Sequence, residues 1–320
     1  MGLVNLILKS ALKRRITQIQ HTLQNPLEVQ LKLLMHLIKK SKNTEWGRKY
    51  DYASITTLAD FKARVPISSY EDIFPIIERA LKGEQNLLWP TNISWFSKSS
   101  GTTNAKSKFI PVSKESLQQC HYKGGKDLLS LYFNNNPDSK LFDGRGLGIG
   151  GSLKPNNKFR NSYYGDVSAV IMANLPIWAQ YVRTPDIETA LMSEWEEKLE
   201  KIAQRTLKEN VTNISGVPTW TVVLIERMLE LSGKDNMLEI WPKFEVFFHG
   251  AVSFTPYRQL FKNFLPSQDV HYVETYNASE GFFGIQDRLG ADDMLLMLDY
   301  GVFYEFLPAS EADNEATEAI

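Results

Sequence analysis

The spacing of apolar residues changes near residue 90, and this change constrains the fold more than any other feature. Before it, apolar residues recur every three or four positions, as in LEVQLKLLMHLIKK, which predicts helices. After it, short β-rich runs such as TNISWFS and FIPV alternate with helical patterns. We therefore expect an α/β fold with mixed sheets. The expected regions are a helical region that packs on the core (1–90), the core itself (91–308) and an acidic tail (309–320).

Individual elements follow from the same patterns. Ser113 is a suitable N-cap for a helix through LQQCHYKGGKDLLSLYF, which Gly124 and Gly125 would weaken or kink. Further helices are expected at 186–209 and 219–231, and strands at 244–248, 270–276 and 301–308.

Charge and cysteine content exclude several classes of protein. The chain of 320 residues has 36 basic and 37 acidic side chains, so no net field attracts nucleic acid or an anionic membrane. The 43% of hydrophobic residues suffices for a large core. One cysteine, Cys120, cannot form an intrachain disulfide, and five scattered histidines give no zinc-site spacing. We expect a cytoplasmic protein with no nucleic-acid partner.

The first twenty residues predict an amphipathic helix. Its run Leu3–Leu8 is short, and the positive charges follow it, unlike those of a signal peptide. Leu6 stands where a myristoylation pattern needs Ser or Thr. We expect this helix to dock on the protein's own core rather than on a membrane. The apolar stripe comprises Leu3, Ile7, Leu8, Leu12, Ile16 and Ile19, and Lys13, Arg14 and Arg15 lie away from it.

A hydroxyl-rich loop, SSGTTNAKSK, lies between the two predicted strands TNISWFS and FIPV. It lacks the second glycine, the adjacent Lys-Ser/Thr pair and the following helix of a Walker loop. Glycine, hydroxyls and lysine still suit a polyphosphate, whereas a polar hairpin tip explains the same composition. Both interpretations remain open on composition alone. The residues concerned are Ser99, Ser100, Gly101, Thr102, Thr103, Lys106 and Lys108.

The segment VETYNASEGFFGIQD places Tyr276, Ser279 and Glu280 together at a predicted strand end. Strand ends commonly carry ligand chemistry in α/β folds. Glu280 could hold Mg²⁺ together with phosphate oxygens, and Tyr276 could stack on a base. The alternatives are a surface carboxylate and a packed tyrosine.

Three other candidates point less clearly to chemistry. Gly146–Gly151 satisfies G-x-G-x-x-G, but no helical pattern follows it, so the anion site of a dinucleotide fold is missing. Cys120 and His121 would point about 100° apart on a helix, which favours a buried thiol over a nucleophile–base pair. His249 suits a ligand-facing role and a core role equally.

Taken together, SSGTTNAKSKFIPVS and YNASEGFFG resemble two signature motifs of the adenylate-forming superfamily, and most closely the plant auxin-responsive acyl-acid amido synthetase family with its bacterial relatives. ISGVPTW, HGAVSFTPY and GVFYEFLP resemble further segments of that family in the expected order. The resemblance implies a large N-terminal domain with mixed sheets flanked by helices, whose core over 91–308 binds ATP. It implies a ligase that converts a small carboxylic acid to an acyl-adenylate and transfers the acyl group to an amine or amino acid.

The resemblance also implies roles for individual residues. Ser99, Ser100, Gly101, Thr102 and Thr103 would wrap the phosphates of ATP, with Lys108 at the family's lysine position. Adenine would stack on Tyr276 and lie against Gly250 and Ala251, with Ser279 nearby. Glu280 would bind Mg²⁺. The acyl pocket would include Tyr122, Val217 and Trp220, although each also suits an ordinary core position.

The sequence departs from the family pattern in two places. Asn104-Ala105 replaces a glycine that many relatives carry, which should stiffen the loop. The family's ribose-binding aspartate, hinge and C-terminal lid follow the segment that GVFYEFLP resembles, so the lid is expected to be absent from this chain and turnover to be impaired. An acyl-CoA ligase and a non-catalytic nucleotide-binding or interaction module remain the alternatives.

Overall fold

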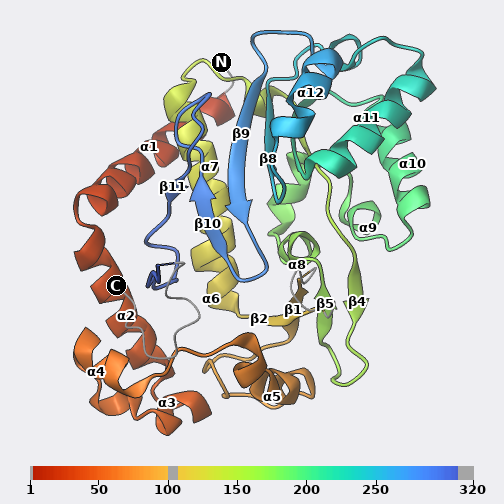
Figure 1. The fold of residues 1–320 in the computed structure, drawn as a ribbon. Coiled ribbons are helices and arrows are strands. Elements are labelled where there is room, and N and C mark those ends of the chain that lie inside the picture. Colours follow the sequence, from red (N-terminus) through yellow and green to blue (C-terminus); the bar gives the residue numbers. More distant parts are fainter. Residues whose placement is uncertain (1–2, 100–106, 309–320) are drawn as a thin grey trace.

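The computed structural model describes residues 3–99 and 107–308, which form two sheets surrounded by helices (Figure 1). The smaller sheet has the strand order β2-β1-β5-β4 and the larger one the order β11-β10-β9-β8-β7-β3-β6. The small sheet contains β1 (Trp95–Lys98), β2 (Phe109–Val112), β4 (Leu153–Pro155) and β5 (Tyr163–Gly165). The large sheet contains β3 (Arg145–Gly148), β6 (Arg183–Thr184), β7 (Val211–Gly216), β8 (Val246–Gly250), β9 (His271–Asn277), β10 (Phe282–Ile285) and β11 (Leu295–Leu296).

Helices precede, follow and connect these strands. Ser113 caps the helical stretch after β2, because its side-chain oxygen accepts a hydrogen bond from the backbone N–H of Ser116. Gly124 and Gly125 do not interrupt this stretch as expected, because both lie within α7, and the irregularity is instead a π-helical turn at Leu117–His121. The helices are α1 (Leu3–Gln24), α2 (Pro26–Ser41), α3 (Glu45–Lys49), α4 (Leu58–Arg64), α5 (Tyr70–Leu81), α6 (Lys114–Ser116), α7 (Tyr122–Asn135), α8 (Val167–Ala173), α9 (Ile187–Ala190), α10 (Trp195–Thr206), α11 (Pro218–Ser232) and α12 (Arg258–Phe264).

Both faces of the large sheet are covered by helices (Figure 1). On one face, α10, α11 and α12 bury a cluster that includes Ile202, Leu224 and Phe261 against the sheet. On the other face, α7 and α1 pack against β8, β9 and β10. Five neighbouring strands, β6, β3, β7, β8 and β9, run parallel, as expected of a sheet covered on both sides. The predicted mixed α/β fold is confirmed.

Helix α1 docks on α7, as predicted, but Arg15 does not lie on its solvent side. Leu12 and Ile19 are buried, and so is Arg15. The Arg15 guanidinium forms a salt bridge with Asp127 of α7, at 2.8 Å between Nε and Oδ1, and a second one with Asp299. The prediction that Arg15 lies off the buried stripe is therefore wrong, because an ion pair with α7 extends the contact face beyond the apolar residues.

Two predicted elements differ from the structure. Residues 301–308 form no strand, because the chain runs along α2, where the side chain of Gln30 donates to the Val302 carbonyl and accepts from the Tyr304 N–H. The single helix expected at 186–209 is two helices, α9 and α10. The turn between them leaves the carbonyl of Ala190 beside Gly150 and directs α10 onto α11.

Within the described residues, no helix is both long and apolar enough to cross a bilayer. The acidic tail predicted over 309–320 lies outside the described part of the chain.

Candidate functional site

The parallel strands of the large sheet end together along one edge. Because paired positions in neighbouring strands lie side by side, the register brings the residues after β7, β8 and β9 to this edge. Val217, Gly250, Ala251 and Tyr276, all predicted from the sequence, therefore lie along it. The register pairs are Gly148–Ser215, Gly216–His249 and Gly250–Thr275.

The turn after β8 has a constrained backbone. A Cβ atom at Gly250 would lie 2.2 Å from the carbonyl oxygen of Thr275, so only glycine lets β8 and β9 pair here. Ala251 has φ +70°, a left-handed conformation that costs a non-glycine residue about 1 kcal/mol. Such strain is found at ligand sites more often than elsewhere, which makes this turn a candidate for ligand contact.

The hydroxyl-rich loop joins β1 to β2, two antiparallel strands, as predicted. The backbone N–H of Ser99 donates to the carbonyl of Lys108 at 2.9 Å and closes the base of the loop. Ser100, Gly101, Thr102, Thr103 and Lys106 lie outside the described residues.

A hydrogen bond connects strand β1, which precedes this loop, to the second motif. Ser97, fully buried in β1, donates from Oγ to the Oγ of Ser279 at 2.9 Å. The two residues are 182 positions apart in the sequence. Strand β1, which leads into the hydroxyl-rich loop, therefore meets the YNASEG segment where the small sheet adjoins the edge of the large one.

The charged and aromatic candidates near this contact differ in how they are held. The Lys108 ammonium lies 5.1 Å from the centre of the Tyr70 ring, a cation–π distance. Tyr276 packs one side of its ring against Phe283 and is 53% exposed, which leaves ring surface for a ligand. Glu280 is exposed.

The three residues expected in the acyl pocket lie on different elements. Tyr122 begins α7 and donates from its hydroxyl to the Ile171 carbonyl of α8, and burial raises the pKa of Tyr122 to about 12. Val217 is the N-cap residue of α11, directly at the strand edge. Trp220, in the first turn of α11, packs edge-on against Trp195 of α10 on the opposite face of the sheet from α7.

The glycine-rich segment Gly146–Gly151 leads into β4 and not into a helix, as predicted. The backbone carbonyls of Gly150 and Gly151 accept hydrogen bonds from Lys198, at 2.6 and 2.9 Å from its Nζ. Burial lowers the pKa of Lys198 to about 8. The motif therefore presents carbonyls to a buried amine, which is the opposite of a phosphate-binding turn.

Sequence reasoning missed the role of His121. The side chain is buried, and its Nδ1 lies 2.9 Å from the Oδ1 of Asn277, next to the second motif. Cys120, also buried, accepts from the N–H of Phe282 at 3.1 Å, which agrees with the expected buried thiol. The π-helical turn thus holds the YNASEG segment and the following Phe282 through these two hydrogen bonds. No local pattern indicates these contacts, because the partners are more than 150 residues apart.

His249 lies in the core. Its ring stacks on Phe254 with centroids 4.1 Å apart, it is 3% exposed, and its Nδ1 has no hydrogen-bond partner among the described residues. Burial, with a smaller effect from the nearby Arg258, lowers the pKa of His249 to about 4.

This burial predicts a dependence of stability on pH. Between about pH 6.5 and 4, the unfolded chain binds a proton at His249 that the folded chain does not, so lowering the pH should reduce the free energy of unfolding by up to about 1.4 kcal/mol per pH unit. We expect His249→Phe to remove this part of the dependence in denaturation curves measured across that window. His36→Gln, at an exposed position, is the control, and parallel curves for wild type and His249→Phe would refute the assignment.

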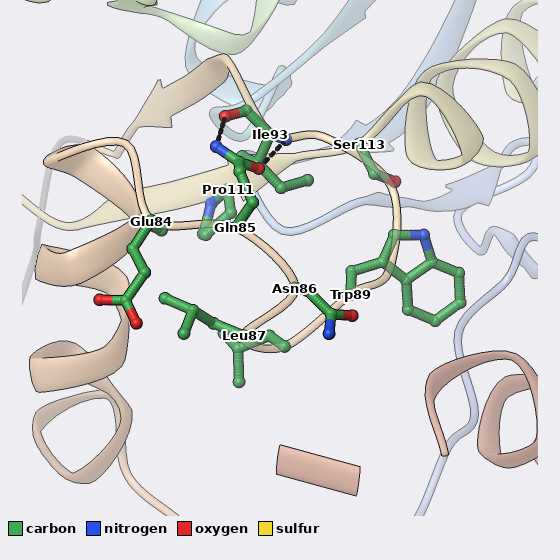
Figure 2. A pocket seen from close by; sticks show the side chains of 10 residues that line it. Glu84, Gln85, Asn86, Leu87, Trp89, Ile93, Pro111 and Ser113 are labelled. Carbon is green, nitrogen blue, oxygen red and sulfur yellow. Dashed lines mark hydrogen bonds between the residues drawn. The ribbon is translucent and has the colours of Figure 1, made fainter. Parts of the chain in front are cut away.

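A cavity of about 260 Å³ lies elsewhere, between the segment after α5 and strand β2 (Figure 2). Gln85 bridges one side of it with two hydrogen bonds to the backbone of Ile93, and Pro111 of β2 forms part of its wall. None of the residues predicted for the site lines this cavity. It is therefore separate from the strand-edge site.

Comparison with known families identifies this arrangement. Residues 15–270 match the model of the GH3 family N-terminal domain, which is most of the chain. The chain belongs to the GH3 family. The segment shared with indole-3-acetic acid-amido synthetase GH3.2 of Arabidopsis thaliana is 31% identical over 117 residues, 36% of this chain and 21% of that protein. A longer alignment, to GH3.3 of the same plant, is 21% identical and covers 91% of this chain and 59% of that protein.

Solved structures show the same fold. A GH3.15 acyl acid amido synthetase matches with a TM-score of 0.75 at 16% identity, over 92% of this chain and 62% of that one. A 2-hydroxyisobutyryl-CoA ligase with bound 2-HIB-AMP and CoA matches with a TM-score of 0.53 at 13% identity, over 84% of this chain and 53% of that one. The fold of this GH3 chain is that of the N-terminal domain of adenylate-forming enzymes. The chain spans less than two thirds of each of these proteins.

Proposed function

We propose that this chain carries the ATP-binding part of an acyl-acid amido synthetase, a ligase that adenylates a small carboxylic acid and passes the acyl group to an amine or amino acid. The hydrogen bond between Ser97 and Ser279 is the observation that carries the proposal. It places the strand that leads into the hydroxyl-rich loop beside Ser279, the residue before Glu280. Membership of the GH3 family supports the same reaction.

The chemistry proceeds in two steps. A carboxylate oxygen of the acid attacks the α-phosphorus of ATP, the bond from that phosphorus to the bridging oxygen breaks, and pyrophosphate leaves. The amine nitrogen then attacks the acyl carbon, loses a proton and expels AMP. Because negative charge spreads over phosphate oxygens in the first step, positioning and electrostatic stabilisation provide most of the catalysis.

The residues along the strand edge would each bind a different part of ATP. Lys108 would place its ammonium on the phosphates, with Ser99, Ser100, Gly101, Thr102 and Thr103 around them. Tyr276 would stack on adenine through its exposed ring face. The nucleotide would also lie beside Gly250 and Ala251 of the strained turn after β8, and beside Ser279 of the YNASEG segment.

Glu280 suits Mg²⁺, which favours sites made of one or two carboxylates together with substrate phosphates. Glu280 is exposed at the strand edge, which leaves room for Mg²⁺ and for the phosphates. When bound, Mg²⁺ would neutralise charge on the phosphates. Glu280 would contribute a fixed carboxylate oxygen.

The acid would lie beyond the nucleotide, against Val217 at the start of α11. Tyr122 of α7 would line the pocket on one face of the sheet and Trp220 would border it on the other. The buried thiol of Cys120 agrees with a reducing cytoplasm, where we propose that the reaction takes place.

Exchange of labelled pyrophosphate into ATP tests the first step. We expect exchange that depends on a carboxylic acid, measured over a panel of acids with this chain and with any longer product of the same gene. Exchange that fails with every acid in the longer product would overturn adenylation and favour a nucleotide-binding module. Product analysis by mass spectrometry with CoA against amino acids then separates an acyl-CoA ligase from an amide-forming enzyme.

A further inference from the structure

Arg183 lies across the glycine-rich strand β3. Its strand, β6, pairs in parallel with β3, so that Arg183 is beside Gly146. A Cβ atom at Gly148 would lie 2.6 Å from the Arg183 Nη2 and 3.6 Å from its Cζ. The missing side chain of Gly148 therefore leaves the space that the guanidinium occupies.

The Arg183 guanidinium has no hydrogen-bond or ion-pair partner among the side chains that the structure describes. The arginines Arg15, Arg79 and Arg227 form salt bridges with carboxylates, whereas the guanidinium of Arg183 makes no hydrogen bond or ion pair with a described residue. Burial is the cause that lowers its pKa, with no nearby charge acting on it. Arg183 is half-buried, so water solvates its charge only in part, and a ligand carboxylate would supply the partner that the described residues lack.

The surface beside Arg183 is open. Gly148 pairs with Ser215 of β7, and paired residues face the same side of the sheet. Ser215 is exposed even though β7 lies in the interior of the sheet, between β3 and β8. The helical cover on this face is therefore open above Ser215, whereas Gly148 itself is buried beneath Arg183 and Met172.

The open surface adjoins the proposed acyl pocket. Met172 of α8 would be 3.1 Å from a Cβ atom at Gly148. The neighbouring residue, Ile171, accepts the hydrogen bond from Tyr122. Val217 follows Ser215 at the strand edge. An acid held between Tyr122 and Val217 could therefore extend past the exposed Ser215 toward Arg183.

We propose that Arg183 binds a second anionic group of the acid substrate, so that the enzyme prefers dicarboxylic acids to monocarboxylic acids of the same length. The inference rests on the proposed function and names its substrate class. One carboxylate would react at the strand edge. The other would accept two parallel hydrogen bonds from the planar guanidinium, a geometry that a lysine cannot reproduce.

Matched pairs of acids test the proposal: adipate against hexanoate, and terephthalate against 4-methylbenzoate. Binding by isothermal titration calorimetry in the presence of ATP, and pyrophosphate exchange, are measured for each pair. We expect wild type to favour the diacid at least about tenfold. Arg183→Met, which keeps the apolar stem, should abolish this ratio, and Arg183→Lys should retain only part of it. Arg160→Met, at an exposed arginine, should leave the ratio unchanged.

Gly148→Ala provides a variant that keeps the charge. The added methyl group would displace the guanidinium and should reduce the diacid preference without reducing the use of monoacids to the same extent. Exchange that shows no diacid preference, or a preference that survives in Arg183→Met, would overturn the proposal and leave adenylation intact. Diacid binding that depends on Arg183 without any exchange would support the site and contradict the proposed function. Absence of binding for every diacid would also overturn the proposal.

Discussion

Replacing Arg15 with methionine should lower the free energy of unfolding by about 3–5 kcal/mol, because it leaves a buried carboxylate without its countercharge. The Asp127 side chain is fully buried, with its Oδ1 at 2.8 Å from the Arg15 Nε. The remaining donor, the Tyr300 hydroxyl at 2.7 Å from Oδ2, carries no charge. Chemical denaturation followed by circular dichroism measures the loss.

The neighbouring Arg14 provides the control for this experiment. It lies on the same helix but is exposed, so Arg14→Met should change stability by less than about 0.5 kcal/mol. Adding Asp127→Asn to Arg15→Met removes the unpaired charge and should recover part of the loss. Equal stabilities of the Arg15→Met and Arg14→Met proteins would show that the ion pair does not anchor α1.

Replacing Lys108 with alanine should reduce acid-dependent pyrophosphate exchange by about 10–100-fold, the value of one charge-assisted hydrogen bond. The position of its ammonium over Tyr70 restricts the lysine before any ligand binds, so little conformational entropy is lost on binding. Lys108→Arg keeps the charge and should retain more activity than alanine.

Lys154→Ala controls for a general loss of positive charge. Lys154 is exposed on β4, and its removal should leave the exchange rate within about twofold. ATP binding, measured by calorimetry, should weaken in Lys108→Ala. Undiminished binding together with undiminished exchange would remove Lys108 from the site and leave the fold assignment untouched.

Elements whose partners are close in sequence could be predicted from the chain. Helix α11 and strands β8 and β9 follow from local apolar spacing, and the Ser113 cap from a single hydroxyl before a helix. Local patterns cannot show a partner at long range. Arg15 was misplaced because Asp127 is 112 residues away. Residues 301–308 alternate like a strand, but the side chain of Gln30 takes the place of a neighbouring strand.

The candidate site was predictable to the same extent. Family resemblance indicated Lys108, Tyr276 and Glu280, and their roles remain predictions. The contact between Ser97 and Ser279 depends on how the two sheets meet, which no segment of the sequence specifies alone. Arg183 carries no local signal, because its importance depends on the lack of a partner in the folded chain.

The contacts of the N-terminal helices with residues 298–304 affect how the protein folds during synthesis. Arg15 and Gln30 bind Asp299, Val302 and Tyr304, which leave the ribosome more than 250 residues later. At about 5–20 residues per second, α1 and α2 must wait on the order of tens of seconds for these partners. By then the apolar face of α2 can already pack on residues 52–65, and Leu12 of α1 on α7, so the polar contacts with residues 298–304 should be among the last to form.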